Sequence, residues 1–280
     1  IKVTGFVGEV QTNIVPPEEI YDLRIRPQDS VSQPILSITA IGDGLYEGQS
    51  EIANVTFPGT IKRIGDRAFA GCSNLTDVSA TDNLVYIGEG AFSGCSKLTT
   101  SFSLGALEYI GDNAFNGCAL MPSINVGSML THIGENAFVG CDNLGISISD
   151  ENHHYRVENN IVYNRDKSNI IASGNAPAII TIPTTVTEIK PNAFFNKSSI
   201  STLHIYGSPT IGSNAFSDCQ NLRTVYFYSF TLPTFGSNSF ANDRFTMYSP
   251  HALREQYISH FDQNVVTANS IPITITLKDG

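Results

Sequence analysis

The chain has 280 residues and a formal net charge of −10, and only 15% of its residues are charged. An acidic chain without a run of Lys or Arg is poorly suited to nucleic acid or to an anionic membrane surface, and no stretch approaches the roughly 20 apolar residues that span a bilayer. Abundant Thr, Ser, Asn and Gly and the absence of Trp predict a β-rich, turn-rich protein.

Residues 1–34 lack the repeat that fills most of the chain, and Pro16, Pro17 and Pro27 interrupt them. We predict an N-terminal cap or leader there. The chain begins at Ile1 without an initiator Met, which is what a mature form with its export signal removed would look like, although a trimmed chain would look the same. We expect an extracellular or outer-surface protein, with a lipid anchor on the lost signal as one way of attachment.

Residues 35–248 are dominated by a recurring phrase, IGxxAFxGC. Its four full copies each start 23 residues after the one before, at Ile64, Ile87, Ile110 and Ile133. A degenerate copy precedes them and three looser ones follow: IGDGLYEGQ from Ile41, IKPNAFFNK from Ile189, IGSNAFSDC from Ile211 and FGSNSFAND from Phe235. A period of this length predicts a solenoid of about eight coils, in which one coil cannot bury its apolar face alone.

Each copy of the phrase is interpreted as a building unit rather than as a site. The acids Asp66, Glu89, Asp112 and Glu135 recur at the start of a predicted one-turn helix, where a negative charge is favourable, and a glycine closes that turn. We expect the first Ile, the Phe and the Cys of each full copy to point into the core: Ile64, Phe69, Cys72, Ile87, Phe92, Cys95, Ile110, Phe115, Cys118, Ile133, Phe138 and Cys141.

All five cysteines occupy the last slot of the phrase, Cys219 being the fifth. Side chains at one slot of neighbouring coils point the same way, which is a poor arrangement for a bridge, so we predict buried free thiols and no disulfides. No metal site is predicted, because Cys-x-x-Cys pairs are absent and His153 and His154, as strand neighbours, face opposite ways.

Two segments depart from the repeat. The interval between Ile133 and Ile189 is about ten residues longer than two periods, and residues 153–173 contain three extended runs separated by Asn159–Asn160 and by residues 165–168. We predict a small β-meander insert projecting from the solenoid. Residues 249–280 are predicted to cap the C-terminal end, with Ser249 and Pro250 starting a helix over 250–260 and a last strand around Ile273, Ile275 and Leu277.

The repeat resembles the BspA-like leucine-rich repeats of bacterial surface and secreted proteins, over about residues 35–248. The resemblance implies a right-handed leucine-rich-repeat solenoid with short parallel strands, and such arrays commonly carry an insert like that at 153–173. It also implies adhesion to host matrix proteins or to other cells, but it carries over no binding residues, because the slots that match are structural.

No constellation of an enzyme is present, and neither catalytic residues nor a cofactor is predicted. Gly42, Gly44 and Gly48 are spaced one residue too far apart for a dinucleotide loop. We predict a non-catalytic, monomeric binding protein whose partner is a host or bacterial surface protein. The side chains at the variable surface slots, and not the repeat itself, must then select that partner. A glycan-binding accessory protein and a structural spacer remain as alternatives.

Two sets of aromatic residues are the candidate binding residues. The slot before the repeat Ile holds Tyr86, Tyr109 and His132, which would form an outward ladder at intervals of about 4.8 Å if the register is kept. In TVYFYSF, Tyr226 and Tyr228 should face away from Val225 and Phe227. Aromatic residues also favour strands for reasons of packing alone.

Overall fold

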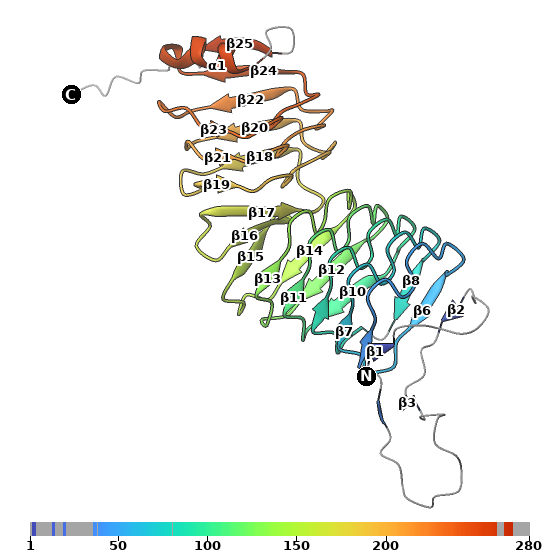
Figure 1. Cartoon of the computed structure of the whole chain (residues 1–280). Helices are drawn as coiled ribbons and strands as arrows, with labels where there is room; N and C mark the ends of the chain where they lie inside the picture. The colour runs from blue at the N-terminus through green and yellow to red at the C-terminus, as the bar shows by residue number, and fades with distance from the viewer. Residues whose placement is uncertain are drawn as a thin grey trace, which may run out of the picture. The chain divides into compact units, whose positions relative to one another are not determined.

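The computed structural model describes residues 39–79 and 81–261, together with the backbone of short strands at 2–3, 13–14, 19–20, 36–37 and 266–270. The chain forms two compact units, Ile1–Arg165 with Ala172–Asn175 and Asp166–Ile171 with Ala176–Gly280. Each unit is a parallel β-solenoid with little helix, as the repeat predicted (Figure 1). Over the described residues there are about nine turns, one more than expected.

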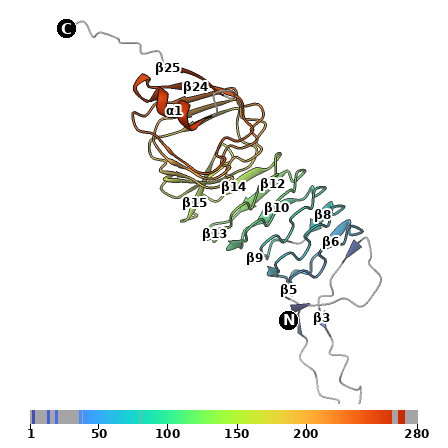
Figure 2. The same ribbon diagram turned by 45° about the horizontal axis from the view of Figure 1, so that its top comes forward.

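The first unit carries its strands in two rows along opposite parts of each coil (Figure 2). One row is a sheet of two-residue strands, named here the short-strand sheet: β1 (Lys2–Val3), β5 (Ala40–Ile41), β7 (Arg63–Ile64), β9 (Tyr86–Ile87), β11 (Tyr109–Ile110) and β13 (His132–Ile133). The other row consists of β2 (Asn13–Ile14), β6 (Asn54–Thr56), β8 (Asp77–Ser79), β10 (Ser101–Leu104), β12 (Ser123–Val126) and β14 (Gly145–Ile148). Strands β3 (Glu19–Ile20) and β4 (Leu36–Ser37) pair antiparallel.

The second unit repeats this plan. Its longer strands form a parallel sheet, named here the long-strand sheet: β18 (Ile179–Ile182), β20 (Thr202–Ile205), β22 (Thr224–Phe227), β24 (Phe245–Ser249) and β25 (Val266–Ser270). The short strands run parallel beside one another as β17 (Asn169–Ser173), β19 (Glu188–Ile189), β21 (Thr210–Ile211) and β23 (Thr234–Phe235).

The insert forms the expected meander of three neighbouring strands in one sheet. Strands β15 (Tyr155–Glu158) and β16 (Ile161–Asn164) form the expected antiparallel hairpin, and Asn159 and Asn160 take positive φ of 52° and 59° at its turn. Strand β17 lies beside β16 in the same sheet and also pairs in parallel with β19 through Asn169 and Ile170. The third strand of the meander is therefore also a strand of the solenoid sheet, and it joins the hairpin to the regular coils.

The phrase IGxxAFxG forms no helix in the described coils; the expected one-turn helices are turns with alternating backbone conformation. In the coil from Ile64, Arg67 and Gly71 adopt positive φ of 55° and 74°. As a result the N–H groups of Arg67, Phe69 and Gly71 donate to the next coil, at 2.7–2.8 Å, whereas those of Ala68 and Ala70 donate back within their own turn. A helix would direct every N–H along its own axis and leave neighbouring coils unbonded.

The core is built from side chains stacked at the coil interval. All twelve expected core side chains of the phrase are buried, and the rings of Phe69, Phe92 and Phe115 stack with centroids 5.5 Å apart. The cysteines form a second column, in which each Sγ donates to a carbonyl of the preceding coil, as Cys95 does to Phe69 at 3.2 Å. All five thiols are free and buried. The Ile, Phe and Cys of the repeat phrase therefore form the buried core of the coils.

The C-terminal end is covered by a helix in the region where one was expected. A 3₁₀ turn at His251–Leu253 leads into α1 (Arg254–His260), and the fully buried Tyr257 stacks on Phe227 at 4.6 Å. Ser249 does not cap this helix: it ends β24, and Pro250 precedes the first turn. The strand expected at 273–277 lies outside the described residues.

The glycines of the IG pairs at Gly65, Gly88, Gly111, Gly134 and Gly212 are required by the close approach of coils, which gives a stability prediction. A Cβ on Gly111 would lie 2.5 Å from the backbone nitrogen of Glu89 and 2.6 Å from the carbonyl carbon of Gly88. Since backbone cannot move aside, we expect Gly111→Ala to lower the free energy of unfolding by about 3 kcal/mol. Gly105→Ala, where a Cβ meets nothing within 4 Å, is the control. Urea denaturation decides, and equal losses would contradict the argument.

The cysteine column ends in a buried acid, which predicts a pH effect. Asp243 is 1% exposed and neither carboxylate oxygen accepts a well-formed hydrogen bond. Burial raises its pKa from 3.8 to about 8, although the nearby backbone of Cys219 opposes part of this shift. Because the folded state then binds the proton more tightly, its contribution to the free energy of unfolding falls as pH rises from about 4 to about 8.

We expect Asp243→Cys to remove this contribution and to stabilise the protein at about pH 8 by about 1–3 kcal/mol, with little gain at about pH 5. The exposed Asp82→Asn is the control. Urea denaturation of each variant and the unaltered protein at both pH values gives the difference, and a gain that does not depend on pH would contradict the argument.

Candidate functional site

The outward slot of the short-strand sheet holds a continuous stack of rings. In β9, β11 and β13 the Ile points into the core, so the residue before it points outward. The parallel register places Tyr109 beside both Tyr86 and His132. The Tyr86 and Tyr109 centroids are 4.6 Å apart with planes at 4°, and those of Tyr109 and His132 are 4.5 Å apart at 13°. These three residues are named the first ladder.

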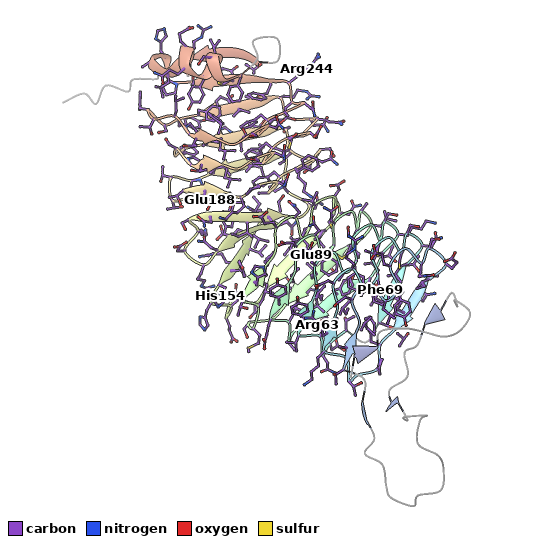
Figure 3. The ribbon with its side chains drawn as sticks, in the orientation of Figure 1. Arg63, Phe69, Glu89, His154, Glu188 and Arg244 are labelled. Carbon is purple, nitrogen blue, oxygen red and sulfur yellow. The ribbon has the colours of Figure 1, made fainter. Side chains whose placement is uncertain are left out.

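An arginine packs on the terminal ring at one end of the first ladder. Arg63, which is labelled in Figure 3, occupies the same slot of β7. Its guanidinium carbon lies 3.7 Å from the centroid of the Tyr86 ring. The same guanidinium lies 3.9 Å from the carboxylates of Asp43 and Asp66. The contact is a cation–π interaction supported by two acids. In the second unit the slot holds Glu188, which pairs with Lys190 at 2.8 Å.

The repeated acids accept hydrogen bonds from the backbone of the next coil instead of capping helices. The backbone N–H of Glu89 donates to Asp66 Oδ1 at 3.1 Å, and that of Glu135 donates to Asp112 Oδ1 at 2.7 Å. The series lies near the first ladder: burial is the main cause that raises the pKa of Tyr109, and the charges of Tyr86 and of nearby Asp112, Asp66 and Glu89 raise it further. Carboxylates and stacked rings therefore share one face.

A second set of stacked rings lies on the long-strand sheet. His204 stacks on Tyr226 at 4.7 Å, and Tyr226 stacks on Tyr248 at 4.7 Å. Two residues further along each chain segment, Tyr206 stacks on Tyr228 at 4.4 Å, and the Tyr228 hydroxyl lies 2.9 Å from His204 Nδ1. These five residues are named the second ladder. Val225 and Phe227 are buried behind it, as the alternation predicted.

The sequence prediction included only Tyr226 and Tyr228 of the second ladder. His204, Tyr206 and Tyr248 were missed because the phrase that revealed the repeat lies elsewhere in the coil. Their signal was a spacing of 22 residues, from His204 to Tyr226 to Tyr248, which sets the same strand position in successive coils.

The stacking limits what the ladders can do chemically. Tyr109 has a ring against each of its two faces, and so has Tyr226. Interior rings therefore present edges and hydroxyl groups to solvent, and only terminal rings have a face free of another ladder ring. A sugar ring therefore has no room to stack flat on an interior ring.

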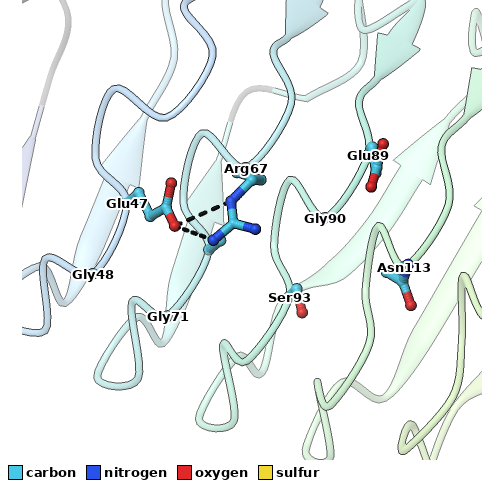
Figure 4. A pocket seen from close by; sticks show the side chains of 9 residues that line it. Glu47, Gly48, Arg67, Gly71, Glu89, Gly90, Ser93 and Asn113 are labelled. Atoms are coloured by element: carbon cyan, nitrogen blue, oxygen red, sulfur yellow. Dashed lines mark hydrogen bonds and ion pairs between the residues drawn. The ribbon is translucent and has the colours of Figure 1, made fainter.

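A shallow pocket of about 420 Å³ lies on the turn face of the first unit (Figure 4). Its lining includes Arg67, Glu89, Ser93 and Asn113, and Arg67 forms an ion pair with Glu47 at its edge. That pair lowers the pKa of Glu47. The pocket therefore offers polar and charged groups for contact with a ligand.

The remaining candidate reactive groups are the buried cysteines and the adjacent histidines of the insert. Burial raises the pKa of the Cys72 thiol to about 11 and that of Cys219 to about 12, so both stay protonated at neutral pH. Within the described ranges no three His, Cys, Asp or Glu residues gather as a metal site, His153 and His154 included. The helices of the same part of the chain are too short to cross a membrane.

Comparison with known families decides the classification. A model of the BspA type leucine rich repeat region matches residues 30–169 and 174–276 in six copies. The chain belongs to this family. BspA-type repeats thus span both units and include every copy of the phrase. A search of curated proteins found no match.

Three solved structures have the fold of these BspA-type repeats. A leucine rich cell surface protein from Faecalibacterium prausnitzii is 18% identical, with a TM-score of 0.54, and the match covers 88% of this chain and 84% of that one. A leucine-rich repeat protein from Eubacterium ventriosum is 22% identical (TM-score 0.59; 76% and 65%). Pneumococcal vaccine antigen PcpA is 18% identical (TM-score 0.59; 85% and 72%). At these identities the likeness concerns fold alone.

The stack in the first ladder should contribute to stability, which a double-mutant cycle measures. We expect Tyr86→Ala and Tyr109→Ala together to cost less than the sum of the single changes, with a coupling of about 0.5–1.5 kcal/mol in the free energy of unfolding. Tyr86 with Tyr226, which belongs to the other ladder, is the control pair, with no expected coupling. Additive losses at Tyr86 and Tyr109 would show that the rings do not interact.

Proposed function

We propose that the chain is a non-catalytic recognition protein that binds another protein through its outward aromatic ladders. The proposal rests on eight rings that lie on parallel sheets at coil intervals, while the apolar residues next to them along each strand are buried in the core. A strand that is fixed on both sides loses little conformational freedom when it binds, and Tyr contributes large contact area with a polar tip.

A protein partner suits the ladders better than a flat sugar does. Ring edges and hydroxyls form hydrogen bonds and edge contacts with side chains, while the faces of Tyr109 and Tyr226 are occupied by neighbouring rings. Tyr206 keeps a different option open, because it is 45% exposed and has a ladder ring on only one side. A glycan-binding accessory role therefore has Tyr206 as its best contact.

We infer display at the cell surface or secretion, and adhesion to host or bacterial surface proteins as the biological role. The support is membership of the BspA-type family together with likeness in fold to a bacterial cell surface protein. A monomer with a removed export signal, attached through a lipid, fits this role. A spacer that holds another module away from the cell is the remaining alternative.

Surface plasmon resonance with immobilised chain tests the proposal against a panel of extracellular-matrix proteins and an array of glycans. We expect at least one protein to bind, and Tyr86→Ala/Tyr109→Ala or Tyr226→Ala/Tyr228→Ala to weaken it about tenfold or more. Met129→Ala, 54% exposed and outside both ladders, is the control, and circular dichroism checks that variants are folded.

The other outcomes separate the alternatives. Binding to glycans alone, lost in Tyr206→Ala, would replace protein recognition by carbohydrate recognition. Binding to no protein or glycan would favour the spacer, and protein binding unaffected by either double variant would move the site away from the ladders.

A further inference from the structure

Negative charge is concentrated on the part of the chain that carries the first ladder. From Ala68 to Asn152 the sequence has nine Asp and Glu residues against one Lys and no Arg. The single Lys97 donates to the side chain of Asn74 at 2.8 Å. An excess of this size gives the face a negative potential that attracts cations and speeds their association.

Three of these acids lie at the same slot of successive coils, three residues after the stacked ring of each. Glu89, Asp112 and Glu135 are exposed, and the ion pairs found among the described residues include none of them. Glu89 also lines the pocket on the turn face (Figure 4). Their charges therefore face solvent beside the first ladder, at the coil interval of about 4.8 Å.

The chain itself shows what this face accepts. The Arg63 guanidinium lies 3.7 Å above the Tyr86 ring and 3.9 Å from Asp43 and Asp66. Tyr and carboxylates thus hold a guanidinium at the end of the ladder where the cations Lys62, Arg63 and Arg67 occur in sequence. Beyond it, the coils of Tyr109 and His132 offer acids and ring edges without any such cation.

We propose that the face of β9, β11 and β13 docks an arginine-rich segment of the partner protein, with its guanidinium groups against Glu89, Asp112 and Glu135. This inference rests on the proposed function and names the chemistry of the partner. Arginine fits better than lysine, because its planar, weakly hydrated group both forks onto a carboxylate and packs on an aromatic ring.

Fluorescence anisotropy with a labelled nona-arginine peptide and the full chain tests the inference at about 50 mM salt, where surface charges are weakly screened. We expect binding that weakens as salt rises, and weaker binding of nona-lysine. Glu89→Gln/Asp112→Asn/Glu135→Gln should reduce the affinity about tenfold. The amide at position 112 keeps the oxygen that accepts from the Glu135 N–H, so the coil stays bonded.

Two matched controls separate the face from net charge. Asp82→Asn/Asp150→Asn/Glu151→Gln removes three exposed charges elsewhere and should change the affinity less than about twofold. Arg63→Ala should tighten binding about threefold by freeing the Tyr86 face, and more than Lys62→Ala, which removes the same charge from a neighbouring residue.

Equal losses in the two triple variants, or no binding of nona-arginine, would overturn the inference. A partner protein whose capture depends on Tyr86 and Tyr109 but not on Glu89, Asp112 and Glu135 would also overturn it, while leaving the proposed function in place.

Discussion

The structure depends on one interaction, the backbone hydrogen bonding between the IGxxAFxG turns of neighbouring coils. A turn whose N–H groups alternate between its own carbonyls and those of the next coil needs left-handed residues at fixed positions. Gly and Asn are the residues that reach this conformation at least cost. Asn113, Asn136, Asn192 and Asn214 share it with Arg67 in their coils. The composition of the phrase follows from this requirement.

Once the register is fixed, every slot becomes a column that runs from coil to coil. The same rule that stacks Phe69 on Phe92 in the core stacks Tyr86 on Tyr109 outside it. Columns also show where the chain departs from its own pattern: the buried Asp243 replaces a cysteine at the last coil of its column. A column tolerates such a change because the backbone bonds, and not one side chain, hold the coils together.

The proposed recognition uses the outward slots of the coils, which the core does not occupy. The ladders and the acids alternate with core residues, so their positions are rigid while their identity can vary without loss of the core. Because the faces of the interior rings are covered, a partner can contact only ring edges, hydroxyls and the nearby carboxylates. These groups suit a protein partner with cationic side chains.

The sequence alone determined the solenoid, its period and its core, because a phrase repeated at 23 residues leaves Ile64, Phe69 and Cys72 no other common role. It also indicated the first ladder, since an alternating strand must turn Tyr86 outward. Only the tertiary structure decided that the turns are not helices, that β17 belongs to the solenoid, and that Tyr206, Tyr248 and Arg63 join the aromatic surface. Those features arise from contacts between coils. The contacting residues are 22 positions apart in one sheet and 23 in the other, so the pairs cannot be identified before the register is known.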